Sequence, residues 1–199
     1  CLGYGPQAML RIVPFLASLG TGPAASLGTG PAASLRPCGL PLYTVRRMNA
    51  YLSQTTEAEK YRITAWEYEG EYAIYNATPY AEQKKKGFGF ANPLNHFYSF
   101  YAGEELVGFI NLYEEETEVF FGIGVAPAHC GKGYGRQMTE IACTLSRRLF
   151  PGKPLYLEVR TWNTRAVRCY QKAGFRIVGE PLRQTTSLGE GLFYRMVAQ

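Results

Sequence analysis

Glycines at positions 131, 133 and 135 alternate with other residues, in a pattern that could bind an anion. Glycines leave backbone N–H groups accessible, and these lie directly before a stretch with the periodicity of an amphipathic helix. Because the positive end of a helix dipole favours anions, a phosphate or pyrophosphate is the natural ligand of such a turn. Lys132 would add a positive charge. Taken alone, the same glycines are equally compatible with a tight turn that binds nothing.

The composition limits which side chains could act on such a ligand. All 16 acidic residues are Glu, and there are only 2 His. An Asp-based Ser-His triad, a Walker-B Asp, an EF-hand loop and a paired-Asp protease site are therefore excluded. A His-rich metal site is poorly supported, and we expect no metal. Catalysis would have to use Glu, Tyr, Cys, Lys, Ser or Thr side chains, or backbone groups.

The glycine turn differs from the two most familiar phosphate-binding motifs. A P-loop requires Ser or Thr after its Lys, but Lys132 is followed by Gly133, and position 126 is not Gly. A dinucleotide fingerprint has the pattern G-x-G-x-x-G, which starts at neither Gly122 nor Gly133. The turn therefore belongs to some other class of anion site.

Apolar periodicity predicts the elements that must position these residues. Strands are expected at 61–67, 96–102, 106–113, 117–126, 155–159, 175–180 and 191–197. Helices are expected within 71–86, broken at Pro79, and at 133–150 and 164–173. A helical crossover makes the strands at 117–126 and 155–159 parallel, whereas the turn at 103–105 makes an antiparallel hairpin. The sheet should therefore be mixed.

The strand at 117–126 has one apolar face and one bare face. Gly122 and Gly124 leave the second face without side chains. This favours either the close approach of a ligand to the backbone or simple close packing against a neighbour. On the next predicted helix, Asn163 and Tyr170 are seven residues apart, about two turns, so they can share one face.

The first 47 residues differ in composition from the rest of the chain. They contain a tandem repeat, residues 18–25 and 26–33, rich in Gly and Pro, which predicts a disordered low-complexity extension. A transit peptide is the less favoured alternative, because Gly-Pro units do not form its amphipathic helix. Met48 stands where the composition becomes globular, and we interpret 1–47 as sequence upstream of the true start. The predicted domain is 48–199.

Charge and cysteine content indicate the setting of this domain. The net charge of +5 comes almost wholly from four Arg before residue 48, so a nucleic-acid-binding role loses its electrostatic basis. Three lysines at 84–86, with Phe88 and Phe90 nearby, could still form a patch that binds nucleic acid. Three lysines in a nearly neutral domain are, however, more often the solvated end of a helix. The five Cys show no disulfide or zinc pattern, and no apolar stretch is long enough to span a membrane. We expect a cytoplasmic protein.

Two segments together resemble the GNAT superfamily of N-acetyltransferases. The first is Cys130-Gly131-Lys132-Gly133-Tyr134-Gly135, similar to that family's Q/R-x-x-G-x-G/A turn, with Cys130 in the usual Arg or Gln position. The second is the segment from Leu157 to Phe175, which matches L-E-V-R-x-x-N-x-x-A-x-x-x-Y-x-x-x-G-F and is similar to the ribosomal-protein alanine acetyltransferase branch. The resemblance covers about 61–197.

The resemblance implies a fold and a cofactor. The fold would be an α/β (α+β) arrangement: a mixed, mostly antiparallel twisted sheet of 6–7 strands with a parallel splayed central pair, flanked by about four helices. Acetyl-CoA would be the co-substrate, its pyrophosphate on the glycine turn and its pantetheine arm in the splay. The implied cofactor-binding residues are Val125, Gly131, Lys132, Gly133, Tyr134, Gly135, Arg136 and Asn163.

The resemblance also implies catalytic roles. Tyr170 would be the general acid for the departing thiolate, and Glu158 the base that accepts the proton of the amine, directly or through water. Glu118 is the rival base and Glu116 a weaker one. Direct attack of the amine is expected. An acetyl-Cys130 intermediate is the less favoured alternative, because no clear activating base stands nearby.

The acceptor is the least determined part of this prediction. It is an amine, either a protein N-terminus or a small molecule, bound by the variable segments 71–95 and 183–191. Four tyrosines could line an aromatic acceptor pocket or belong to the core: Tyr72, Tyr75, Tyr80 and Tyr101. A non-catalytic acyl-CoA-binding or sensing module is the alternative function. A monomer or homodimer is expected, with no nucleic-acid or membrane partner.

Overall fold

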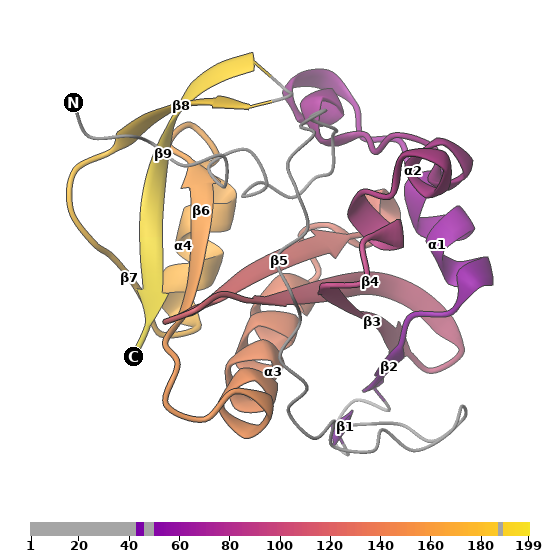
Figure 1. Ribbon diagram of the computed structural model, residues 1–199, viewed down its shortest axis with the longest axis horizontal. Helices are drawn as coiled ribbons and strands as arrows, with labels where there is room; N and C mark the ends of the chain where they lie inside the picture. Colours follow the sequence, from indigo (N-terminus) through magenta and orange to yellow (C-terminus); the bar gives the residue numbers. More distant parts are fainter. Residues whose placement is uncertain (1–42, 46–49, 187–188) are drawn as a thin grey trace.

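A computed structural model describes residues 43–45, 50–186 and 189–199 of the chain (Figure 1). Its strands are β1 Tyr43–Val45, β2 Ala50–Gln54, β3 Asn95–Ala102, β4 Glu105–Glu114, β5 Val119–Val125, β6 Leu155–Arg160, β7 Phe175–Ile177, β8 Leu182–Thr186 and β9 Gly189–Ala198. Its α-helices are α1 Glu57–Thr64, α2 Tyr80–Lys86, α3 Tyr134–Leu149 and α4 Thr164–Lys172. Short 3₁₀ helices are η2 Gly70–Tyr75, η3 Gly89–Ala91 and η4 Pro127–His129.

The strands form one mixed sheet in the order β1-β2-β3-β4-β5-β6-β9-β7, with β8 also paired to β9. The β5–β6 pair is parallel, and the other pairs within the described residues are antiparallel. β5 and β6 are in register only at Val119 with Leu155 and at Phe120 with Tyr156. Beyond these residues the two strands diverge. The expected mixed sheet with a parallel, splayed central pair is confirmed.

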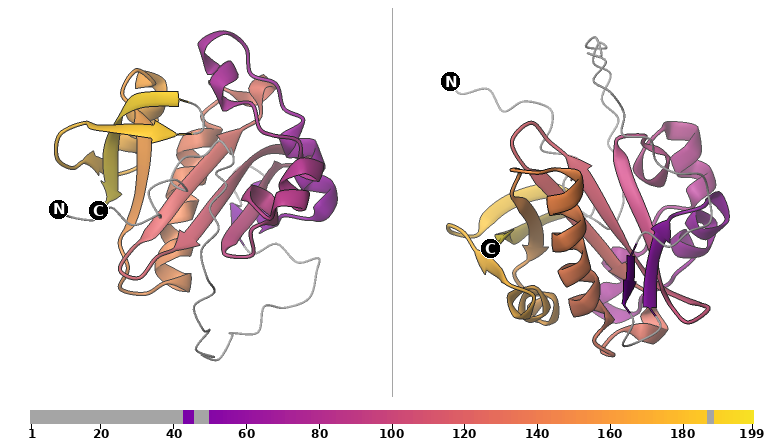
Figure 2. Two further views of the ribbon diagram at one scale, coloured as in Figure 1. Left: turned by 45° about the horizontal axis from the view of Figure 1, so that its top comes forward. Right: turned by 90° about the horizontal axis from the view of Figure 1, so that it is seen from below.

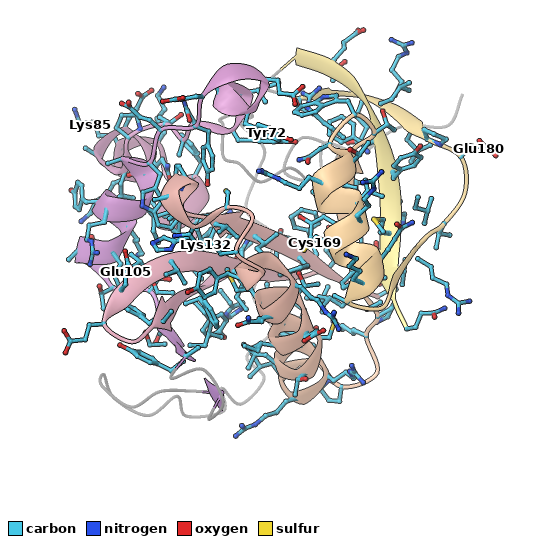
Figure 3. The ribbon with its side chains drawn as sticks, turned by 180° about the vertical axis from the view of Figure 1, so that it is seen from behind. Tyr72, Lys85, Glu105, Lys132, Cys169 and Glu180 are labelled. Atoms are coloured by element: carbon cyan, nitrogen blue, oxygen red, sulfur yellow. The ribbon has the colours of Figure 1, made fainter. Side chains whose placement is uncertain are left out.

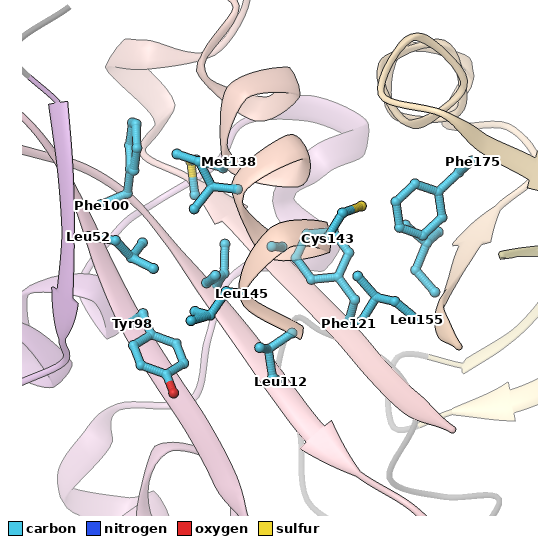
Figure 4. Close-up of a cluster of buried hydrophobic side chains, with 14 of the residues drawn as sticks. Leu52, Tyr98, Phe100, Leu112, Phe121, Met138, Cys143, Leu145, Leu155 and Phe175 are labelled. Carbon is cyan, nitrogen blue, oxygen red and sulfur yellow. The ribbon is translucent and has the colours of Figure 1, made fainter. Parts of the chain in front are cut away.

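The main hydrophobic core lies between the sheet and α3. Of the apolar residues predicted to share one face of this helix, Met138, Ile141, Ala142 and Leu145 are buried, whereas Leu149 in its last turn is exposed. The buried side chains pack on side chains of the central strands, among them Phe121 (Figure 4). Burial of this apolar stripe fixes α3 along β4 and β5 and so places its N-terminus at the open end of the splay.

A second, smaller core lies on the opposite face of the sheet. It is formed by Ile63, Tyr80, Phe90, Phe97, Leu106 and Phe109, with Trp66 and Ala77 packed against it. Figure 2 shows α1 and α2 on the other side of β3–β5 from α3. The splayed end of the sheet is therefore bordered by α3 and α4 on one face and by the α1–η3 region on the other.

Several predicted elements were wrong or missing. The strand expected at 61–67 is instead occupied largely by α1, which begins at a capping box formed by Thr56 and Glu59. This local signal was present in the sequence and outweighs the apparent alternation of apolar residues. The strands β1, β2 and β8 were not predicted, so the sheet has nine strands within the described residues rather than 6–7. β2 is short, and β8 is mostly exposed, which weakens their sequence signal.

The predicted extension over residues 1–47 lies mostly outside the described residues. Within that range only Tyr43–Val45 is described, and it pairs antiparallel with β2 as β1. The boundary between an extension and a domain at residue 48 stays a prediction. Among the described residues no helix is both long enough and apolar enough to cross a membrane.

Candidate active site

A cavity of about 630 Å³ occupies the splay between β5 and β6. It continues from the first turn of α3 and the side of α4, past the ends of both strands, to side chains of the second core. The splay makes this space because strands that are no longer hydrogen-bonded to each other leave a gap for a ligand. Most of the residues predicted for the site meet around it.

The backbone of β5 is exposed toward this gap. Ala126 N–H donates to Val107 carbonyl at 2.9 Å, so in the alternating antiparallel pattern the next opposed pair, Val125 and Gly108, exchanges no hydrogen bonds. The N–H and carbonyl of Val125 therefore point away from β4, as do those of Ile123 two residues earlier. An extended ligand with amide groups could pair with β5 here as a further strand would.

The turn before α3 has the geometry expected of an anion cradle. Gly131 and Gly133 have φ of +81° and +87°, a left-handed conformation that glycine adopts without strain. Gly133 is the N-cap residue and supplies no side-chain cap, so the first amides of α3 have no side-chain acceptor at the cap. Gly131, Gly133 and Gly135 all line the cavity.

Gly135 also lets α4 approach α3 closely. A Cβ at this position would lie 3.2 Å from Cys169 Sγ, tighter than ordinary contact. Figure 3 labels Cys169 on α4 and Lys132 in the turn before α3. Lys132 itself is exposed and does not line the cavity, and Tyr134 packs its ring on Phe100. The side chains of these two predicted residues therefore do not line the cavity.

Cations on α4 border the same part of the cavity, and the sequence reasoning missed them. Arg165, Arg168 and Lys172 line it together with the predicted Arg136 of α3. Their spacing of three and four residues places them along one side of α4, a signal that a search of this helix face would have found. Arg136 is paired with Glu140 at 2.7 Å. The anion cradle is thus bordered by side-chain charges as well as backbone amides.

Glu158 lines the cavity from β6. Leu157 and Val159 belong to the main core, so strand alternation directs Glu158 to the opposite face of the sheet. Arg160, on that same face, is 4% exposed and donates to Glu190 carbonyl at 3.2 Å. The carboxylate therefore stands at the divergence of the strands, on the face that carries the second core.

Tyr170 and Asn163 both line the cavity from α4, as their spacing predicted. Burial raises the pKa of the Tyr170 phenol, so the hydroxyl stays protonated far into the alkaline range. Asn163 is the N-cap of α4: its side chain accepts from Ala166 N–H at 3.2 Å and donates to Tyr75 hydroxyl at 3.1 Å. It thus links α4 to η2 across the site.

The rival acidic residues lie elsewhere. Glu118 is ion-paired with Arg195, and neither it nor Glu116 lines the cavity. Cys130 does line it, and its thiol lies 3.6 Å from Val125 carbonyl as a weak donor. Glu158 is the one carboxylate among the lining residues that the structure describes.

The four candidate tyrosines have different surroundings. Tyr75 lines the cavity. The ring of Tyr72 is tilted against that of Trp162, with centroids 5.7 Å apart, and the guanidinium of Arg165 lies over it. Tyr80 is 2% exposed and donates to Glu57, and Tyr101 donates to the buried Glu59, so both serve the packing of α1. The idea of a pocket lined by all four is therefore wrong.

Both roles considered for Gly124 are compatible with its surroundings. A Cβ there would overlap the ring of Phe109 from β4, so this glycine permits close packing of an aromatic side chain. Gly124 also lines the cavity, where its backbone is open to a ligand.

The lysines at the end of α2 form ordinary surface pairs, Lys84 with Glu57 and Lys86 with Glu82.

Comparison with known sequences places the chain in a family. Residues 58–175, more than half of the chain, match the acetyltransferase (GNAT) family. The N-alpha-acetyltransferase RimI of Mycobacterium tuberculosis is 35% identical over 97 residues, which are 45% of this chain and 57% of that protein. The chain thus matches little more than half the length of this curated relative.

Comparison with solved structures shows the same fold. A spermidine N-acetyltransferase SpeG chimera from Vibrio cholerae and hSSAT has a TM-score of 0.60 and 22% identity, covering 75% of this chain and 94% of that one. The Vibrio cholerae spermidine N-acetyltransferase in complex with CoA and spermine has a TM-score of 0.58 and 20% identity, covering 74% and 94%. At these identities the likeness concerns the fold alone.

Proposed function

The chain belongs to the acetyltransferase (GNAT) family, a family that uses acetyl-CoA, and on this premise we propose that it transfers the acetyl group to a primary amine. The observation that carries the proposal is the splay of β5 from β6. It opens a single cavity that reaches from the uncapped first turn of α3 to Glu158 and Tyr170.

The residues around the cavity suit the parts of acetyl-CoA. The amides at 131–136 and the side chains of Arg136, Arg168 and Lys172 hold the phosphates, since backbone donors and cations both favour anions there. The gap-facing N–H groups of Ile123 and Val125 and the carbonyl of Ile123 bind the amide-containing arm, while the carbonyl of Val125 accepts from Tyr68 hydroxyl. Acetyl-CoA supplies an activated acetyl thioester to this site.

The protein's own groups then move the protons. Glu158 accepts the proton that the amine must lose before or during attack, directly or through water. A gap-facing N–H of β5 stabilises the negative charge that develops on the carbonyl oxygen. Tyr170 protonates or hydrogen-bonds the departing thiolate, and burial, which raises its pKa, keeps its hydroxyl protonated for this role. Asn163 holds the start of α4, and so the position of Tyr170, relative to η2.

The acceptor is a peptide N-terminus or a small amine. The curated relative is an N-alpha-acetyltransferase and the structural neighbours are spermidine N-acetyltransferases, so both classes deserve testing. The domain boundary at residue 48, the cytoplasmic location, the absence of a metal and the monomeric or homodimeric state stay predictions from the sequence.

The deciding experiment measures CoA release from acetyl-CoA with a panel of peptide N-termini, polyamines and aminoglycosides. We expect turnover with at least one acceptor class. Glu158→Gln and Tyr170→Phe should each lower kcat by roughly 10²-fold or more, the usual contribution of a positioned acid or base. Binding of CoA with no turnover for any amine would favour the alternative, a non-catalytic acyl-CoA-binding module.

Matched controls separate chemistry from folding. Tyr98→Phe changes a buried phenol of the main core, and Glu82→Gln changes an exposed acid on α2, both outside the cavity lining. Neither should change kcat. If Tyr170→Phe retained full activity on the best acceptor, the role of general acid would be wrong. If Glu118→Gln, and not Glu158→Gln, abolished turnover, the base would be Glu118.

A further inference from the structure

One arm of the cavity is apolar, and its lining comes from elements other than α3 and α4. It is lined by Ile63, Trp66, Ala77, Phe90 and Phe109, which come from α1, the segments beside η2, η3 and β4. Building on the proposed acetyltransferase function, we propose that this arm binds an apolar side chain next to the acceptor amine. The acceptor would then be a primary amine adjacent to a large apolar group, and not a polyamine.

The walls of the arm are preformed by packing. Ile63, Phe90 and Phe109 are 3–5% exposed and belong to the second core. The ring of Phe109 contacts those of Phe90 and Trp66, with centroids 5.3 and 6.0 Å apart. Aromatic walls fixed by a core cannot turn away to let water in, so an apolar group that enters the arm is removed from water and gains the corresponding free energy.

The charges around the cavity disfavour a polyamine. A polyamine has cationic groups beyond the reacting amine, and each would need an acidic partner. Among the described lining residues Glu158 is the single acid, and the apolar arm itself contains none. Glu67, Glu69 and Glu71 are exposed and lie outside the lining.

The five side chains that line the apolar arm have no group that can neutralise a charge. Ile63, Ala77, Phe90 and Phe109 are hydrocarbon, and the indole N–H of Trp66 is the one polar side-chain group among the five. The nearby hydroxyls of Tyr68 and Tyr75 each already make one hydrogen bond, to Val125 carbonyl and from Asn163. A charged side chain placed in the arm would therefore lose water without gaining a partner of opposite charge.

The required chemistry could come from a peptide or from a small molecule. A peptide that begins with Leu, Met or Phe has an apolar side chain next to its free amine, and so does an arylalkylamine such as phenethylamine. The two sources differ in size: a peptide continues beyond its first residue, whereas an arylalkylamine has no such chain. Parallel assays with Leu-, Ala- and Glu-initiated peptides of otherwise identical sequence, phenethylamine and spermidine distinguish them.

Ala77→Leu tests the arm directly, because Ala77 lines it and a larger side chain would fill it. Ala73→Leu is the matched control: Ala73 lies in η2, is exposed and does not line the cavity. Wild type should favour the Leu-initiated over the Ala- and Glu-initiated peptide by at least about tenfold in kcat/KM, the usual effect of added methylenes in an apolar pocket. Ala77→Leu should reduce that preference, and Ala73→Leu should not.

The outcomes separate this inference from the function on which it rests. If no amine released CoA, the proposed function itself would fail. If turnover occurred but spermidine, or the Glu-initiated peptide, were the best acceptor, the acetyltransferase would stand and the apolar arm would not be its acceptor site. An Ala77→Leu variant that unfolds leaves the wild-type peptide ranking, which decides the matter on its own.

Discussion

Tyr68 hydroxyl donates a 3.0 Å hydrogen bond to the carbonyl of Val125, the last residue of β5. Tyr68 begins a loop that is closed by Asn76, whose side chain accepts from Tyr68 N–H at 2.6 Å and donates to Tyr68 carbonyl at 3.3 Å. This loop contains η2. One hydroxyl therefore ties the segment beside the apolar arm to the gap-facing edge of β5.

Loss of this hydroxyl should affect the acceptor more than the coenzyme. Tyr68→Phe should lower the free energy of unfolding by about 1 kcal/mol, the net value of a typical hydrogen bond. Because the loop beside the arm is then less firmly held, the acceptor KM should rise several-fold, while Kd for CoA changes less. Steady-state kinetics measures the acceptor KM, calorimetric titration the Kd for CoA, and thermal unfolding the stability. Tyr98→Phe is the control. A greater loss in CoA affinity would assign Tyr68 to the coenzyme site.

The positive φ of Gly133 should matter for coenzyme binding. Gly133→Ala places a Cβ in a left-handed conformation, which costs about 1–2 kcal/mol or distorts the turn. Gly152→Ala is a matched control, because Gly152 also has a positive φ of +83° and no atoms within 4 Å of its Cβ position, but follows the far end of α3. Both variants should lose similar stability in thermal unfolding. Only Gly133→Ala should weaken CoA in titration; equal weakening by both would refute the cradle.

The pH profile should reflect the buried phenol. Because burial raises the pKa of Tyr170, its acid form persists to higher pH than that of an ordinary tyrosine, with reference pKa about 10. We expect kcat/KM to rise with pH as the acceptor amine loses its proton, with no fall caused by Tyr170 below about pH 10. Tyr170→Phe should lower the whole profile without changing its shape. A fall at alkaline pH in wild type that is absent from Tyr170→Phe would contradict this.

Glu59 should stabilise the protein in a pH-dependent way. Burial alone would raise its pKa, but hydrogen bonds from Tyr101, Thr56 and Ser99 outweigh this and lower it. A lowered folded pKa means that its stabilisation is full above the unfolded value, about 4.3, and is lost as the pH falls through the folded pKa. Glu59→Gln should cost about 1–3 kcal/mol at pH 7.

Urea unfolding of wild type and Glu59→Gln at pH 7 and at pH 3 measures this effect. The difference between them should shrink at the lower pH, because at pH 3 the Glu59 carboxylate of the unfolded chain, with a reference pKa of about 4.3, has taken up a proton, which favours unfolding of the wild type. Glu82→Gln removes an exposed pair with Lys86 and should change stability by less than about 1 kcal/mol. A difference for Glu59→Gln that is independent of pH would mean that packing, and not the carboxylate charge, is responsible.

Some of these relationships could be foreseen from local patterns. Three features each depend on a few consecutive turns of backbone: the glycines before α3, the apolar stripe of that helix, and the shared side of α4 on which Asn163 and Tyr170 lie. Periodicity and positive-φ preference act over that range, so the sequence was a reliable guide there. The capping box at Thr56 and Glu59 is a local signal of the same kind, and it explains why α1 forms where the alternation of apolar residues predicts a strand.

Motifs and short-range spacing were enough to identify the family and the order of the central elements. Tertiary packing was needed to show which acid lines the cavity: Glu158 does so, whereas Glu118 is ion-paired with Arg195. It also decided the apolar arm, whose walls Ile63, Ala77 and Phe109 are brought together by packing across the sheet. Contacts between residues so distant along the chain depend on strand register and core packing, which a one-dimensional pattern does not specify.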